Sequence, residues 1–119
     1  MSARPAPEFQ IAPCPLGGAP GVSLHGEVDV WSSSALRDVL DRRIRESEGA
    51  FVVDLSELEF LDSSGLSVLL HARAQLRWDH RPLAIVCPPG PVRRLIEVAG
   101  VTDLLAVYES RAAAATALL

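Results

Sequence analysis

The sequence predicts an α/β protein built on a mainly parallel sheet. From residue 22 onward, strand-like and helix-like segments alternate in the order β-α-β-α-β-α-β-α, and such alternation joins parallel strands through right-handed helical crossovers. Of the nine prolines, five lie in residues 1–20 and four in residues 82–91, so the long middle segment is free for regular structure. The 119 residues suit one domain. We expect a flexible tail over residues 1–8 and a single domain over residues 9–119.

The first elements are short and surround a turn. Phe9 and Ile11 predict a brief edge strand that ends near Pro13. The segment LGGAPG at residues 16–21 is typical of a turn. Residues 22–28 alternate apolar and polar side chains, which predicts a strand.

The middle of the chain predicts two helices separated by a buried strand. Serines 32–34 offer N-caps for a helix whose apolar residues recur every three or four positions as far as Ile44. Residues 51–55 are short, β-branched and apolar on both faces, as in a buried parallel strand. A second helix is predicted to begin at Asp62. Its expected core face consists of Leu66, Leu69, Leu70, Ala74 and Trp78.

The C-terminal part repeats the pattern twice. Residues 82–86 predict a third buried strand that starts with a proline, where a strand tolerates one. Pro91 suits the first turn of a third helix, and Gly100 suits its end. Residues 104–107 are predicted as a final strand, and residues 109–119 as an alanine-rich terminal helix.

Composition excludes several classes of function. The net charge of −4 argues against nucleic acid or a membrane as partner, because both need a basic face. All 11 basic residues are arginine, which excludes a Schiff-base lysine and a P-loop lysine within this chain. Cys14 and Cys87 fit no metal motif or redox pair. The sequence does not exclude a disulfide between them, but two free thiols in a reducing cytosol are the simpler expectation. No signal-peptide pattern and no apolar run near the ~20 residues of a membrane span occur, so we expect a cytoplasmic protein.

Residues that could perform catalysis are scattered. The three histidines fall in a strand, a helix and a turn, and residues 61–65 lack the first glycine of a nucleophile elbow. Six acids and no base lie between Glu46 and Asp62. These acids form either a solvated loop and strand end or a negative rim around the start of the second helix. A carboxylate pair for glycoside hydrolysis would need an aromatic-lined cleft, and the sequence indicates none. We therefore expect no enzyme, no cofactor and no metal.

The most informative segment is Asp62-Ser63-Ser64-Gly65-Leu66. In one interpretation, Asp62 or Ser63 caps the helix and Gly65 allows a close approach. In the other, a serine exposed at this helix N-terminus lies beyond the carboxyl ends of parallel strands, where α/β sheets place functional loops. A phosphate there would meet free N–H groups and the positive end of the helix dipole, while the nearby acids would oppose it.

Five short blocks occur in order along the chain: GEVD at 26–29, VDLS at 53–56, FLDSSGL at 60–66, PVRRL at 91–95 and VAGV at 98–101. Together they resemble the STAS domain, and in particular the anti-sigma factor antagonists of bacteria, over about residues 9–110. The resemblance implies a mixed sheet of four or five strands, with about four helices mostly on one side. Ser67 stands where that family often has glycine.

The resemblance also implies a mechanism of partner switching. In that family, the serine directly after the aspartate, here Ser63, is phosphorylated by an anti-sigma factor that is also a serine kinase. The unmodified antagonist binds that kinase and frees the sigma factor; phosphorylation breaks the complex, and a PP2C-type phosphatase restores it. The positions that match the family's partner-binding end are Gly26, Asp29, Asp62, Ser64 and Gly65.

Two alternatives remain open at this point. The chain could be a STAS subunit of a lipid transporter or of a larger signalling complex, without serine phosphorylation. A neighbouring kinase or phosphatase gene would favour partner switching, whereas a transporter operon would favour this alternative. A small α/β enzyme would need a deep pocket with perturbed titratable groups.

Overall fold

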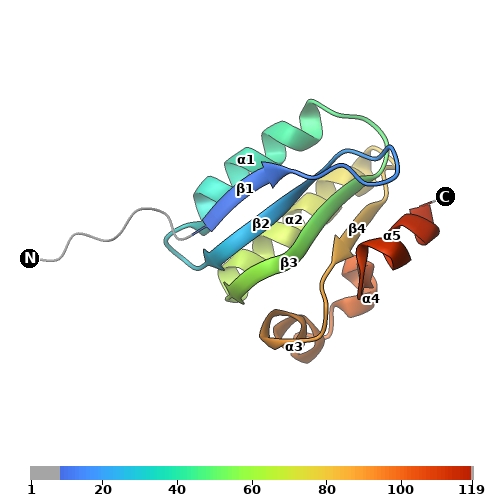
Figure 1. Cartoon of the computed structure of the whole chain (residues 1–119). Helices are drawn as coiled ribbons and strands as arrows, with labels where there is room; N and C mark the ends of the chain where they lie inside the picture. The colour runs from blue at the N-terminus through green and yellow to red at the C-terminus, as the bar shows by residue number, and fades with distance from the viewer. Residues whose placement is uncertain (1–8, 119) are drawn as a thin grey trace, which may run out of the picture.

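The sheet is mixed, as the resemblance implied, and runs through the middle of the molecule (Figure 1). The computed structural model describes residues 9–118, and the predicted tail over residues 1–8 lies outside this range. Strands are adjacent in chain order; the first pair is antiparallel and the other three pairs are parallel. The strands are β1 (Phe9–Pro13), β2 (Gly21–Val28), β3 (Phe51–Leu61), β4 (Leu83–Val86) and β5 (Val107–Tyr108).

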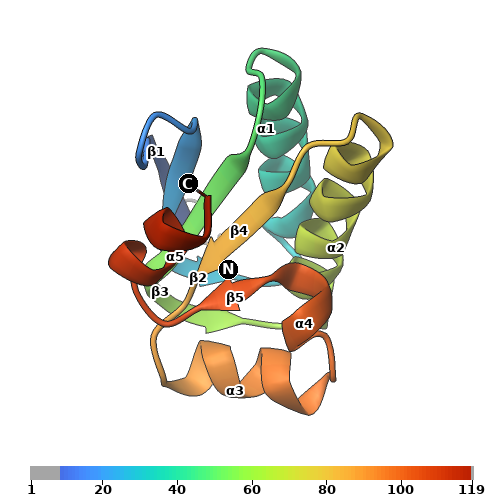
Figure 2. The same cartoon turned by 90° about the vertical axis from the view of Figure 1, so that its right-hand side faces the viewer.

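The helices cover the two faces of the sheet unequally. They are α1 (Ser33–Arg45), α2 (Ser63–Trp78), α3 (Pro91–Val98), α4 (Thr102–Leu105) and α5 (Arg111–Leu118). Helices α1 and α2 lie side by side on one face, and α5 lies on the opposite face (Figure 2). The prediction of helices mostly on one side is thus confirmed. Within residues 9–118, no helix combines the length and apolar character that crossing a membrane requires.

The main core fills the space between the sheet and the helices α1 and α2. Residues 51–55 of β3 are all buried, and β3 pairs in parallel with β2 and β4, which confirms the prediction of a buried parallel strand. The largest fully buried side chains include Leu24, Leu36, Leu40, Ile44, Phe51, Leu69 and Leu76. A smaller cluster on the other face packs Ala114 of α5 against Val52, Ala84 and Val86.

Strand β3 is longer than predicted. It continues past residues 51–55 to Leu61, because residues 57–61 keep pairing with β2 in parallel register. Leu58 and Leu61 are buried along this extension, whereas Glu57 and Glu59 are exposed. These two acids therefore lie on a strand rather than in a loop.

The predicted final strand over residues 104–107 is largely wrong. Leu104 and Leu105 belong to α4, and β5 comprises only Val107–Tyr108. Ala106 takes a left-handed conformation, with φ of 53°, which ends α4 and turns the chain into the strand. A short apolar run is compatible with a buried turn of helix as well as with a strand. Here the run forms a turn of helix that buries Leu105 in the core.

The core face of α2 also differs from the prediction near its C-terminal end. Leu69 is buried as expected, but Ala74 is exposed and Trp78 is 86% exposed. The buried stripe continues through Ala72 and Leu76, because a spacing of three to four residues keeps those positions over the sheet. The Trp78 indole is consequently on the molecular surface.

A buried carboxylate joins α5 to the sheet. Asp54 of β3 accepts hydrogen bonds from the Ser56 N–H at 2.8 Å and the Ser56 hydroxyl at 2.5 Å. Nη1 of Arg111 lies 3.2 Å from the second oxygen of Asp54, and Nη2 donates to the Pro15 carbonyl at 3.1 Å. Arg111 therefore ties the first residue of α5 to β3 and to the turn after β1.

We expect Arg111→Met to lower the free energy of unfolding by about 1–2 kcal/mol, because the buried Asp54 side chain would lose its only cationic partner within residues 9–118. Urea unfolding followed by circular dichroism measures this change. Arg94→Met, at an exposed position of α3, is the control and should change stability by less than about 0.5 kcal/mol. Equal stability of the two variants would contradict a structural role for Arg111.

Candidate functional site

The site is built where the parallel strands β2 and β3 end together. Val28 pairs with Leu61, and the Asp62 N–H donates to the Val28 carbonyl at 3.2 Å. Asp29 and Asp62 therefore follow neighbouring strand ends directly. Helices α1 and α2 both begin at this edge, so their N-termini face the same region.

Asp62 is the N-cap of α2. Its Oδ1 accepts hydrogen bonds from the Ser64 N–H at 3.0 Å, the Gly65 N–H at 3.1 Å and the Ser64 hydroxyl at 2.5 Å. Of the two residues that could cap this helix from the sequence, Asp62 has that role. The first turn closes when the Leu66 N–H donates to the Asp62 carbonyl at 2.9 Å.

These contacts keep Asp62 charged. Partial burial raises the pKa of its carboxyl group, but hydrogen bonds from the Ser64 hydroxyl and from the backbone N–H groups of Gly65, Ser64 and Val30 outweigh that effect. The net result is a pKa below the usual value for aspartate. A fixed negative charge thus lies beside Ser63 at neutral pH.

The two serines that follow Asp62 have different environments. Ser63 is exposed as the first residue of α2, and its carbonyl accepts a hydrogen bond from the Ser67 hydroxyl at 3.0 Å. The Ser64 hydroxyl is turned toward Asp62 and held there. Ser63 is therefore the hydroxyl that a second protein can reach.

The two glycines selected from the sequence have backbone roles. Gly65 is buried, and a Cβ there would lie 2.9 Å from Cγ1 of Val28 and closer still to Leu61. Any larger residue would force Val28 and Leu61 to shift, so glycine allows α2 to start this near to the sheet. Gly26 lies inside β2, has a φ of 90° and adjoins a shift in register with β3, so it is not grouped with the helix starts.

Asp29 organises the start of α1 in a similar way. Its Oδ1 accepts from the Trp31 N–H at 2.9 Å and the Ser32 N–H at 3.2 Å, and its own N–H donates to the Ser32 hydroxyl at 3.0 Å. This turn leaves Val30 65% exposed and Trp31 70% exposed. The sequence-based predictions missed these two residues, although apolar side chains between a strand and a run of serines were a usable signal.

The other reactive side chains do not converge on this site. Cys14 and Cys87 are free thiols, and burial raises the pKa of the Cys87 thiol to about 11. His25 contacts the Ser23 hydroxyl, and His71 lies 3.5 Å from Asp41. Among residues 9–118, no three His, Cys, Asp or Glu side chains are placed to hold a metal ion.

Comparison with known proteins gives consistent matches. A family model described as "Mlab, STAS domain" matches residues 16–106. The anti-sigma F factor antagonist of Paenibacillus polymyxa is 31% identical over 98 residues, which cover 82% of this chain and 84% of that protein.

Solved structures agree with the sequence matches. An anti-sigma factor antagonist from Mycobacterium paratuberculosis superposes with a TM-score of 0.81 at 27% identity, covering 95% of this chain and 97% of that one. The anti-sigma factor antagonist SpoIIAA in its unphosphorylated form has the same fold, with a TM-score of 0.67 at 20% identity and coverage of 84% and 87%.

We expect Asp62→Ala to destabilise the protein by about 1 kcal/mol at neutral pH, the usual cost of losing an N-cap. Because the pKa of Asp62 is lower in the folded than in the unfolded chain, this stabilisation is complete above about pH 4 and is lost as the pH falls through the folded pKa. Urea unfolding of both proteins at a series of pH values measures the difference.

The matched control is Asp38→Ala, at an exposed position of α1. Its effect on stability should be smaller at neutral pH. If the difference between Asp62→Ala and the wild type stayed constant into the acid range, the charged carboxylate would not be the stabilising group.

Proposed function

The chain belongs to the STAS domain family, and from this we propose that it is an anti-sigma factor antagonist regulated by phosphorylation of Ser63. In its unmodified state it binds an anti-sigma factor that is also a serine kinase, and a sigma factor is released. Phosphorylation of Ser63 by that kinase ends the complex, and a PP2C-type phosphatase reverses the modification. The observation that carries this proposal is the contrast between the exposed Ser63 and the Ser64 hydroxyl held by Asp62.

The proposed partner surface surrounds the start of α2. Asp29, Asp62 and Ser64 shape it through their turns and caps, and Gly65 contributes through the backbone, whereas Gly26 lies inside β2 and is not grouped with them. The exposed Trp31 beside this edge supplies the kind of large aromatic anchor that dominates many protein interfaces. The surface therefore combines an apolar anchor with acidic groups.

A phosphate on Ser63 acts against this interface for electrostatic reasons. It adds about −1.5 to −2 charges beside the ionised Asp62. The N–H groups of Ser64 and Gly65 are already used by Asp62, so they do not compensate the phosphate. The helix dipole offsets only about 1 kcal/mol. A misplaced interfacial charge costs about 3 kcal/mol, which is more than a hundredfold in affinity.

We predict that Ser63→Ala binds the cognate kinase and is not released by ATP, and that Ser63→Asp binds weakly because it supplies part of the negative charge. Ser64→Ala is the matched control and should still accept phosphate, since Ser63 is the exposed hydroxyl. Incubation with the kinase and ATP, followed by mass spectrometric mapping and a binding assay, measures both effects. Phosphate on Ser64 alone, or undiminished kinase binding by protein phosphorylated on Ser63, would refute the mechanism.

We also predict that the exposed acids of β3 steer association. Replacing both Glu57 and Glu59 with Gln should lower the association rate at low ionic strength, with little change in the dissociation rate, because rim charges act mainly on encounter. Stopped-flow binding at low and high salt measures this. The control pair, Glu46→Gln with Glu48→Gln, makes the same charge change at the other end of β3. An equal effect of the two pairs would contradict local steering.

The partner itself is best identified by affinity capture from the native organism with mass spectrometry. Recovery of a GHKL-type kinase with the chain phosphorylated on Ser63 in the unbound fraction is the expected result. Recovery of membrane transporter subunits with unmodified Ser63 would instead favour the lipid-transporter alternative.

A further inference from the structure

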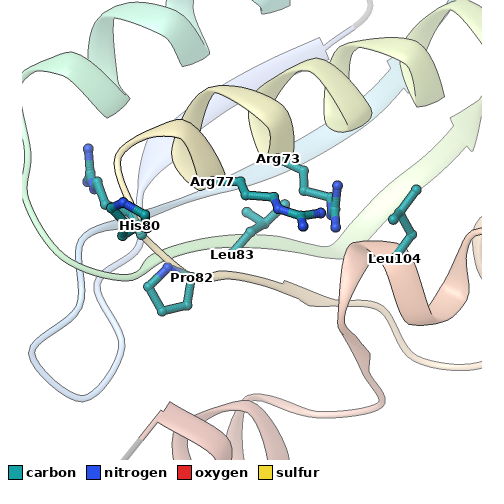
Figure 3. A pocket seen from close by; sticks show the side chains of 7 residues that line it. Arg73, Arg77, His80, Pro82, Leu83 and Leu104 are labelled. Atoms are coloured by element: carbon teal, nitrogen blue, oxygen red, sulfur yellow. The ribbon is translucent and has the colours of Figure 1, made fainter.

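A concave site lies at the C-terminal end of α2, the opposite end of that helix from Ser63. A cleft of about 340 Å³ opens between α2, the start of β4 and α4 (Figure 3). It is lined by Arg73, Arg77, His80, Arg81, Pro82, Leu83 and Leu104. A hollow of about 450 Å³ adjoins it and shares Arg73, Arg77 and His80, adding Ala74 and Trp78. None of the residues lining either space is acidic.

Two of the arginines in the cleft have no protein partner within residues 9–118. The guanidinium group of Arg81 is already hydrogen-bonded within the protein. It donates to the carbonyls of Gly49 and Ile44, both at 2.7 Å, and so holds the end of α1 in place. The guanidinium groups of Arg73 and Arg77, in contrast, make no hydrogen bond or ion pair with any other residue of this range. Their guanidinium groups are available to a ligand.

The spacing of Arg73 and Arg77 favours an anion bound between them. They are one helical turn apart on α2, and like charges at this spacing repel each other. Figure 3 shows both side chains extending from α2 on the side that faces Leu104 of α4. The planar guanidinium group matches the oxygens of phosphate in a two-point contact. A phosphate between them would remove the repulsion.

The indole of Trp78 provides an apolar surface next to these charges. Trp78 is 86% exposed and lines the same hollow as Arg73 and Arg77. Ala74, one turn earlier, is small and leaves the space beside the indole open. Exposed aromatic side chains of this kind stack on planar rings of ligands.

His80, at the rim of both spaces, has a strained backbone. It follows the C-cap of α2 with a φ of 58°, a left-handed conformation in which glycine is the usual residue. The His80 N–H donates to the Arg77 carbonyl and the Arg81 N–H to the Leu76 carbonyl, both at 2.9 Å. Strain of this kind is concentrated at functional sites. An imidazole is present here although glycine would suit the backbone better.

We propose that this cleft binds a small phosphorylated molecule that carries an aromatic ring, with its phosphate groups at Arg73 and Arg77 and its ring on Trp78. The volume lies in the usual range of ligand pockets, about 300–1,000 Å³. An anionic membrane surface is disfavoured, because lipid-binding clusters typically contain about 4–8 basic residues and only two arginines are unpaired here. The site is independent of the proposed partner switching.

The test is an NMR titration of the full chain with three probes: pyrophosphate, adenosine 5′-diphosphate and adenosine. We expect saturable shifts confined to residues 73–83 and to α4 with the two phosphates, affinity about tenfold higher for adenosine 5′-diphosphate than for pyrophosphate, and no saturation with adenosine. Trp78→Ala should bring the affinity of the diphosphate down to that of pyrophosphate. The double variant Arg73→Gln with Arg77→Gln should abolish binding of both.

The matched control is Arg42→Gln with Arg45→Gln, which removes two exposed arginines from α1 and should leave binding unchanged. The proposal is overturned if neither phosphate gives saturable shifts, if the double variant on α2 binds like the wild type, or if the ring adds no affinity. Sedimentation with phosphatidylglycerol vesicles is the second arm. Vesicle binding that depends on Arg73 and Arg77, without binding of the soluble phosphates, would overturn the proposal in favour of a membrane surface.

Discussion

One carboxylate oxygen, Oδ1 of Asp62, determines how the functional end of the molecule is arranged. It accepts three hydrogen bonds from the first turn of α2, two from Ser64 and one from Gly65. A helix rotates by about 100° per residue, so fixing Ser64 toward Asp62 turns Ser63 away from it. Because Gly65 has no side chain, the same turn can press against Val28 and Leu61. The capping of α2 and the exposure of Ser63 therefore both follow from the hydrogen bonds to this one oxygen.

The topology of the sheet also explains how charged side chains are distributed between the two ends of α1 and α2. Parallel strands joined by helices place the N-termini of α1 and α2 at one edge and their C-termini at the other. Acids near the first edge, such as Asp29 and Asp62, complement the positive ends of the helix dipoles. Arginines in the last turn of α1, with Arg77 in the last turn of α2, complement the negative ends. The acids at one end of these helices and the arginines at the other thus both complement the helix dipoles.

The sequence predicted most of the elements because their signals are local. Alternation in residues 22–28, the buried run in residues 51–55 and the helix start at Asp62 all depend on neighbouring residues. The errors arose where tertiary contacts decide. Residues 57–61 form a strand only because β2 lies beside them, and Trp78 is exposed because the stripe over the sheet passes through Leu76. The sequence also left open which residue caps α2, since aspartate and serine are both good caps.

Helix α2 connects Ser63 with the arginine cleft, and its packing indicates that the two ends act independently. Its 16 residues span about 24 Å, well beyond the Debye length of about 8 Å at physiological salt. Direct electrostatic coupling between the two ends is therefore screened, and coupling would require the helix to move. Leu69 and Leu76 are fully buried against the sheet, and Gly65 is in close contact with β2 and β3, so sliding of α2 would disrupt close packing along its length. We therefore expect a ligand in the proposed cleft to leave the position of Ser63 unchanged, so that α2 holds both proposed sites without one controlling the other.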